Sequence, residues 1–143
     1  MLKYFILLSY LIVNNAYSRD FLPIPAKFKQ IIGTIESNNN DFAIGDNHKA
    51  LGRYQIWLIC YRDCTNYDKT ITFSYNSLTN KANSDKIMEV YLNKYGRELL
   101  IKNDYESLAR LWNGGCNWRN KTGKAKENLD NYVNKFKKAQ KNS

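Results

Sequence analysis

The sequence predicts an α+β fold that is mainly α, with one small β-hairpin. Several segments carry apolar residues at helical spacing, whereas residues 38–52 place a few apolar residues among Asn, Asp and Gly, which is typical of a hairpin. The sequence contains no internal repeat and no linker rich in Pro, Gly and Ser. The length suits one core, so we expect residues 19–143 to form a single domain.

A secretory signal peptide is predicted for residues 1–18. Lys3 precedes a short apolar run, and the segment ends in Ala16-Tyr17-Ser18, a small-x-small cleavage pattern. The apolar run is too short for a comfortable membrane span, although a retained signal anchor is the alternative. We therefore expect a secreted, monomeric protein without stable membrane insertion.

The first predicted helix ends on a carboxylate. Pro25 suits the start of a helix, and the apolar residues that follow recur at helical spacing. Glu36 falls in the last turn, beside the buried face. Partial desolvation there raises the pKa of a carboxyl group and suits it to donate a proton near neutral pH. The alternative is an exposed glutamate at a fraying helix end.

The predicted hairpin follows directly and turns near Asp46 and Asn47. A hairpin beside the first helix would form one wall of a cleft, and Asp46 would then face Glu36. The alternative is that Asp46 only caps the turn, because Asp-Asn is ordinary turn chemistry. Asp41 is the second choice for a carboxylate facing Glu36.

Two more helices are predicted in the middle of the chain. Residues 54–63 suit a helix with Ile56, Ile59 and Cys60 facing inward, and Ser84 suits the N-cap of a helix that stops at Gly96. Residues 66–79 are not assigned.

The C-terminal part predicts two helices and a tail. Asp104 starts a helix that halts at Asn113-Gly114-Gly115, where glycine allows the backbone to approach a ligand closely. Leu129, Tyr132, Val133 and Phe136 form the apolar face of a last helix that closes the core. The Lys-rich residues 135–143 predict a helix end that frays into a solvated basic tail.

Three motifs follow one another in a consistent order. They are Glu36-Ser37, then Leu51-Gly52-Arg53-Tyr54-Gln55-Ile56, then Ala109-Arg110-Leu111-Trp112-Asn113-Gly114-Gly115. Together they resemble the lysozyme-like superfamily, and within it the invertebrate-type lysozyme or destabilase family. The resemblance covers roughly residues 28–136 and implies a lysozyme-like helical domain with the hairpin beside the catalytic helix.

The resemblance implies a lysozyme, or muramidase, which cleaves the β-1,4 glycan backbone of bacterial peptidoglycan without a cofactor. Glu36 would be the general acid and later the base. Asp46, or Asp41 in its place, would be the nucleophile or electrostatic stabiliser, since retaining hydrolysis uses two carboxylates about 5 Å apart.

The resemblance also implies residues that bind sugar. They are Tyr54, Gln55, Asn113 and Gly114, with Tyr61 and Trp112 as stacking surfaces. Packing is the more common role of such aromatic side chains. Trp112 stands where the family often has histidine, and His48 is the only histidine in the chain. The sequence therefore argues against the isopeptidase activity that some destabilases have.

The chain has three cysteines, far fewer than typical family members. Secretion favours a disulfide, and the resemblance implies Cys64 with Cys116, while Cys60 with Cys116 remains open. A zinc site is not expected, because one histidine and three cysteines without a Cys-x-x-Cys pair make a poor ligand set.

The formal net charge of +9 favours polyanionic partners. Motifs for nucleic-acid binding are absent, so we expect the partner to be the glycan strands of peptidoglycan. Two alternatives stay open. A lytic transglycosylase would use Glu36 alone, and a non-catalytic basic wall-binding or antimicrobial protein would use only its charge or its cleft.

Overall fold

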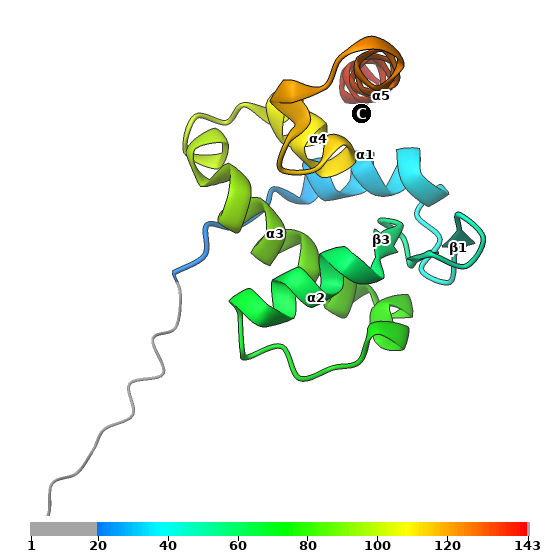
Figure 1. Ribbon diagram of the computed structural model, residues 1–143, viewed down its shortest axis with the longest axis vertical. Helices are drawn as coiled ribbons and strands as arrows, with labels where there is room; N and C mark the ends of the chain where they lie inside the picture. The colour runs from blue at the N-terminus through cyan, green and yellow to red at the C-terminus, as the bar shows by residue number, and fades with distance from the viewer. Residues whose placement is uncertain (1–19, 143) are drawn as a thin grey trace, which may run out of the picture.

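The computed structural model describes residues 20–142, so the predicted signal peptide lies outside the described residues. Over this range the protein is α+β and mainly α, as predicted (Figure 1). The elements in order are α1 (Ala26–Ser37), β1 (Ile44–Gly45), β2 (Ala50–Leu51), β3 (Ile56–Trp57), α2 (Leu58–Tyr67), the 3₁₀ turn η1 (Tyr75–Thr79), α3 (Lys81–Ile101), α4 (Tyr105–Gly114), the 3₁₀ turn η2 (Trp118–Asn120) and α5 (Gly123–Lys141).

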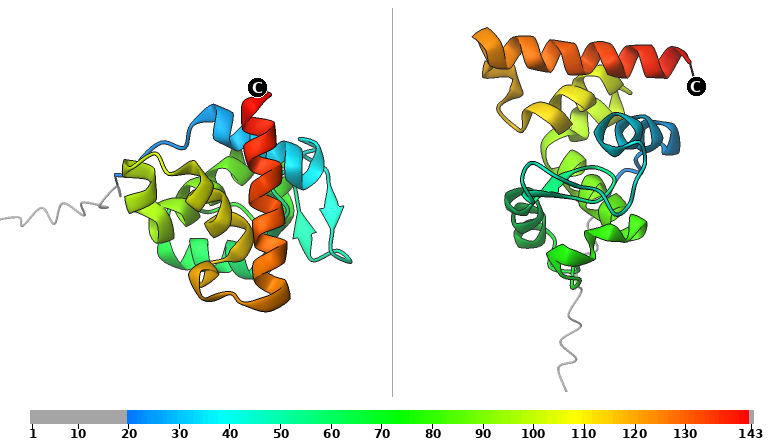
Figure 2. Two further views of the ribbon diagram at one scale, coloured as in Figure 1. Left: turned by 90° about the horizontal axis from the view of Figure 1, so that it is seen from above. Right: turned by 90° about the vertical axis from the view of Figure 1, so that its right-hand side faces the viewer.

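The long helix α3 lies in the middle of the molecule and packs against α2 on one side and α4 on the other. Helix α5 lies across α4 and α1 and covers both of them (Figure 2). The sheet projects from the end of α1, next to the start of α2 (Figure 1). This arrangement brings the C-terminal ends of α1 and α4 to the side of the molecule where the sheet lies.

One hydrophobic core joins the helices. Ile32 of α1, Met88 of α3, Leu108 of α4 and Phe136 of α5 are all almost completely buried in it. Burial of a side chain of this size stabilises the fold by about 1.5–3 kcal/mol. The core therefore fixes α5 against α1.

The predicted hairpin is confirmed, with its turn at Asp46 and Asn47. In β1 and β2, Ile44 pairs with Leu51 and Gly45 with Ala50. A third strand, β3, was not predicted, and it pairs with β2 to complete an antiparallel sheet.

The predicted helix at residues 54–63 was wrong in its start and in placing Ile59 inward, whereas Ile56 is buried and Cys60 packs against the core as predicted. Gln55 has a φ of 49°, which interrupts a helix there. Ile56 and Trp57 form β3 instead, and α2 begins only at Leu58. The later start turns Cys64 into the core and leaves Ile59 75% exposed.

The predicted bounds of α3 were also wrong. Asn80, not Ser84, caps the helix and accepts hydrogen bonds from the next turn, while Ser84 is buried and donates to the carbonyl of Leu78. Gly96 is a kink inside the helix and not its end. A Cβ on Gly96 would lie 2.6 Å from Leu111 Cδ2, so glycine allows α4 to pack closely there.

The C-terminal helices agree better with the prediction. Asp104 caps α4 by accepting a hydrogen bond from the Ser107 N–H, and α4 ends at Gly114. The predicted apolar face of α5 is buried. The expected fraying was wrong, because α5 stays helical through Lys141. No helix within residues 20–142 has the length and apolarity needed to cross a membrane.

Gly52 lies where the backbone after β2 approaches Leu78 of η1 and Ser84 of α3 closely. Its φ is +74°, and a Cβ there would collide with the carbonyl oxygen of Leu78. The Gly52→Ala variant should lower the free energy of unfolding by about 2–4 kcal/mol, because the backbone strain and the collision each destabilise the fold.

Gly123→Ala is the matched control, because Gly123 has a φ of +54° with nothing near its Cβ position. Urea unfolding should show a loss of about 1 kcal/mol for this control. Equal losses in the two variants would contradict the packing argument.

Candidate active site

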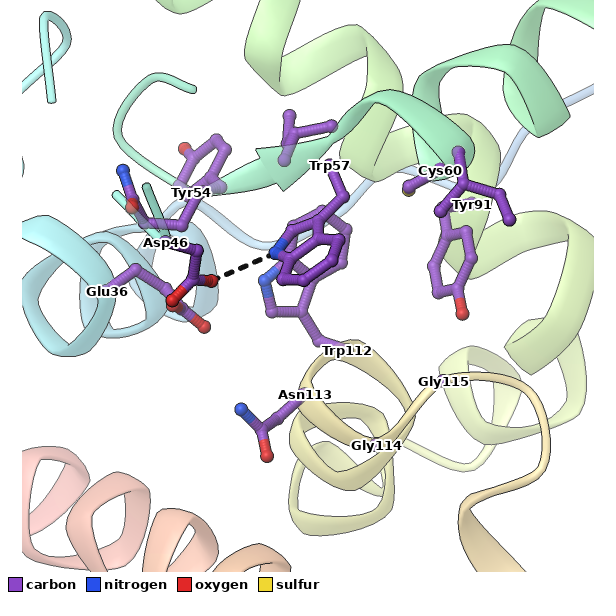
Figure 3. Close-up of a pocket in the computed structure, with 13 residues that line it drawn as sticks. Glu36, Asp46, Tyr54, Trp57, Cys60, Tyr91, Trp112, Asn113, Gly114 and Gly115 are labelled. Carbon is purple, nitrogen blue, oxygen red and sulfur yellow. Dashed lines mark hydrogen bonds between the residues drawn. The ribbon is translucent and has the colours of Figure 1, made fainter. Parts of the chain in front are cut away.

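A cleft of about 450 Å³ lies between the sheet and the C-terminal end of α4 (Figure 3). The end of α1 and the start of α2 complete its walls. Its lining residues are Glu36, Asp46, Tyr54, Gln55, Ile56, Trp57, Ile59, Cys60, Tyr91, Trp112, Asn113, Gly114 and Gly115. The cleft thus brings together seven of the eight residues that the sequence predicted for catalysis and sugar binding, all except Tyr61.

Glu36 lies in the last turn of α1, as predicted, and its side chain is half-buried. Tyr132 of α5 donates a hydrogen bond from its hydroxyl to Glu36 Oε1 at 2.6 Å. The neighbouring Ser37 donates to the carbonyl of Arg53 at 2.8 Å, which joins the end of α1 to the segment between β2 and β3. Tyr132 therefore holds the carboxyl group directly, while Ser37 fixes the helix end that carries it.

The pKa of Glu36 is raised above its ordinary value, chiefly because burial disfavours the charged form. The hydrogen bond from Tyr132 works against this rise, since it stabilises the carboxylate. Asp46 raises the pKa further by charge repulsion, and Lys135 lowers it by attraction. The direction agrees with the sequence-based expectation and suits a group that donates a proton near neutral pH.

Asp46 extends from the hairpin turn, where its φ is 49°. Its carboxylate accepts a hydrogen bond from Trp57 Nε1 at 3.1 Å. Figure 3 shows the side chains of Glu36 and Asp46 pointing into the same space. The carboxylate of Asp46 therefore faces the cleft and lies close enough to Glu36 to affect its pKa.

Asp41, the second choice for this role, lies elsewhere. Its carboxylate accepts a hydrogen bond from Arg53 Nε at 2.6 Å in an ion pair. It does not line the cleft. The structure thus selects Asp46 over Asp41 as the carboxylate that faces Glu36.

The opposite wall comes from the end of α4. Trp112 packs edge-on against both Tyr54 and Tyr91, with interplanar angles of 83° and 88°. Asn113 is exposed and Gly114 follows it at the helix end. An exposed amide beside an aromatic wall offers hydrogen bonds and an apolar surface to a ligand.

Tyr54 forms part of the wall but does not offer its hydroxyl to the cleft. The residue is 1% exposed, and its hydroxyl donates to Asp85 Oδ1 at 2.6 Å. Asp85 also pairs with Lys29 and Lys81. The hydroxyl of Tyr54 is therefore not placed to bind sugar, contrary to the role that the sequence predicted for this residue. Gln55 does line the cleft, and its amide donates to the carbonyl of Gly52.

Tyr61 lies outside the cleft lining, contrary to the prediction. Its hydroxyl donates to the carbonyl of Phe73 at 2.5 Å, and its ring packs against Phe73 and Tyr75. These contacts turn Tyr61 toward the segment before η1 and η1 itself. Tyr61 fixes that segment and does not stack on a ligand in the cleft.

The predicted Cys64–Cys116 disulfide is absent, and all three cysteines are free. Cys64 is buried and its thiol donates to the carbonyl of Ile87 at 3.7 Å, whereas Cys116 is exposed beyond the end of α4. Cys60 is half-buried and lines the cleft. Within residues 20–142, no group of three His, Cys, Asp or Glu side chains could hold a metal ion.

Three functional positions escaped the sequence analysis. Trp57, which binds Asp46, was assigned to a helix. Tyr91 falls within the helix predicted from Ser84 to Gly96 and was given no role in the site, and Tyr132 was assigned to the apolar face of the last helix. The only signal for Tyr132 was a hydroxyl within an otherwise apolar helix face, because a buried tyrosine needs a hydrogen-bond partner.

Comparison with protein-family models, with curated proteins and with solved structures found no match to the chain.

The Tyr132→Phe variant should raise the pKa of Glu36 further. It removes the hydrogen bond that stabilises the carboxylate, which is the larger of the two effects that oppose burial. Titration of ¹³C-labelled glutamate by NMR measures this pKa. Tyr105→Phe is the control, because the hydroxyl of Tyr105 donates to Asn103, outside the cleft. An unchanged or lower pKa in Tyr132→Phe would contradict the assigned role of this bond.

The Glu36→Gln variant should be more stable than the wild type near neutral pH, and the difference should disappear in acid. Below the ordinary value of 4.5, Glu36 is protonated in both states. As the pH rises, the unfolded chain loses this proton first, so the wild type loses stability until the pH passes the folded pKa. Urea unfolding from about pH 4 to about pH 7 should show the difference widening. The same series for Glu98→Gln, at an exposed glutamate, should show no such widening. A constant difference for Glu36→Gln would contradict the raised pKa.

Proposed function

We propose that the protein is a secreted lysozyme that hydrolyses the β-1,4 glycan backbone of bacterial peptidoglycan. The observation that carries this proposal is the pair of carboxyl groups in one cleft, Glu36 half-buried with a raised pKa and Asp46 exposed on the facing wall. Glycoside hydrolysis requires one protonated and one ionised carboxyl group on either side of the bond that breaks.

In the proposed reaction, Glu36 donates its proton to the glycosidic oxygen as the bond to the sugar carbon breaks. Asp46 then attacks this carbon or stabilises its positive charge. Glu36, now ionised, takes a proton from the water that completes hydrolysis. Burial favours the protonated form of Glu36, which the first step uses, and the bond from Tyr132 stabilises the anion that forms after proton transfer.

The walls of the cleft suit a sugar chain. Trp57 and Trp112 offer aromatic surface from the two sides, and Asn113 offers an amide. Aromatic faces pack against the apolar faces of sugar rings, while amides bind their hydroxyl groups. The order of the Glu-Ser, Gly-x-x-Gln-Ile and Asn-Gly-Gly motifs, which resembles invertebrate-type lysozymes, supports the same proposal.

A lytic transglycosylase is the second candidate, and one observation favours it. Of the two carboxyl groups, Glu36 alone is held by a hydrogen bond from the helical core, whereas Asp46 extends from a turn and is bound only by a tryptophan side chain. A transglycosylase needs only the acid, because a group of the substrate itself displaces the leaving sugar. Its product carries an anhydro end instead of a new reducing end.

The first test is clearing of bacterial wall suspensions by residues 19–143. The Glu36→Gln variant should lose about 10²–10⁴-fold in rate, because an amide cannot donate the proton. Asp46→Asn should also lose most of its activity if the enzyme is a hydrolase.

The outcomes of this test separate the candidates. Full activity in Asp46→Asn together with anhydro products would replace the hydrolase with the transglycosylase. Equal clearing by the wild type and both variants would contradict either enzyme and leave a basic wall-binding protein.

A further inference from the structure

The cleft presents only negative charge to a ligand. Its lining includes Glu36 and Asp46 but no lysine, arginine or histidine. Every second sugar of peptidoglycan carries a lactyl carboxylate, to which its peptide is attached. A glycan with free or peptide-borne carboxylates would meet repulsion from the carboxylate of Asp46 beside the reacting bond, unless a cation nearby offsets it.

Lys135 is in a position to supply this cation. It follows Tyr132 by three residues on α5, which is one helical turn. Tyr132 binds Glu36 Oε1 at 2.6 Å, so this face of α5 lies against the Glu36 end of the cleft. Figure 3 shows the faint red and orange ribbon of α5 passing beside Glu36 and Asn113.

The charge of Lys135 reaches the cleft and is open to solvent. Its attraction is among the effects that act on the pKa of Glu36, which places its ammonium group within electrostatic range of that carboxyl. The residue is exposed. Other lysines of α5 are engaged in ion pairs, Lys124 with Glu127, Lys126 with Asp130 and Lys137 with Glu106.

We propose that Lys135 determines the specificity of the cleft by binding a carboxylate of the glycan at its Glu36 end. The inference rests on the proposed function and deepens it. It makes the substrate an acid-bearing glycan of alternating sugars, in preference to a neutral polymer of N-acetylglucosamine such as chitin. An ammonium on a flexible stem suits this role, because it can follow a carboxylate that hangs from the sugar ring.

Binding to an inactive protein tests this proposal without interference from catalysis. In the Glu36→Gln background, calorimetry measures the affinity for two oligosaccharides of equal length. One is a neutral oligomer of N-acetylglucosamine, and the other is the alternating oligomer with a lactyl carboxylate on every second sugar. Lys135→Gln should weaken binding of the acidic oligomer about fivefold and leave the neutral one unchanged.

Two further variants serve as controls. Lys135→Arg keeps the charge and should keep the preference for the acidic oligomer. Lys141→Gln removes an exposed charge from the same helix, about 9 Å farther along the axis, and should change neither affinity. The fivefold loss in Lys135→Gln should shrink as salt is added, because salt screens an exposed ion pair.

The outcomes distinguish this proposal from the proposed function. If Lys135→Gln changes both affinities alike, or neither, Lys135 does not recognise the carboxylate of the glycan. Wall clearing that depends on Glu36 would then still support the proposed enzymatic function. An equal loss in Lys141→Gln would show that net charge, and not this position, attracts the acidic oligomer. If the protein binds neither oligomer and clears no walls, both proposals are wrong.

Discussion

The hydrogen bond between Tyr132 and Glu36 joins the two ends of the domain at one carboxyl group. It requires that α5, the last helix, be packed onto α1, the first, and the buried side chains of α1, α4 and α5 provide this packing. Tyr132 is itself buried, and desolvation together with the charge of Glu36 raises the pKa of its phenol well above the ordinary value. The phenol therefore donates its hydrogen bond to Glu36 as long as the protein is folded. Because core packing places Tyr132, the pKa of Glu36 depends on the packing of the whole core.

The sheet contributes the other half of the site through a few short-range contacts. Ser37 binds the carbonyl of Arg53, and Arg53 in turn pairs with Asp41. These bonds hold the hairpin at the end of α1, since strands of two residues cannot be stable alone. The hairpin then presents Asp46, and β3 presents Trp57 to bind it. Asp41 thus helps to hold the hairpin in place, whereas Asp46 faces the cleft.

The prediction from sequence succeeded where one local rule decided the outcome. Apolar periodicity located α1 and α5, an aspartate cap located α4, and an Asp-Asn turn located the hairpin. It failed between residues 54 and 63, where helical periodicity hid a two-residue strand. Periodicity cannot reveal such a strand, because pairing with β2 and the positive φ of Gln55 determine it.

The sequence by itself determined a mainly helical α+β domain, a glutamate at the end of its first helix and an aspartate in the next turn. Those features depend on residues a few positions apart, whose interactions are local. Only the tertiary structure decided that Tyr132, far along the chain, binds Glu36, that Asp46 and not Asp41 faces it, and that the hydroxyl of Tyr54 turns away to Asp85. These outcomes depend on how helices pack and which polar groups find partners once buried, and no local pattern contains that information.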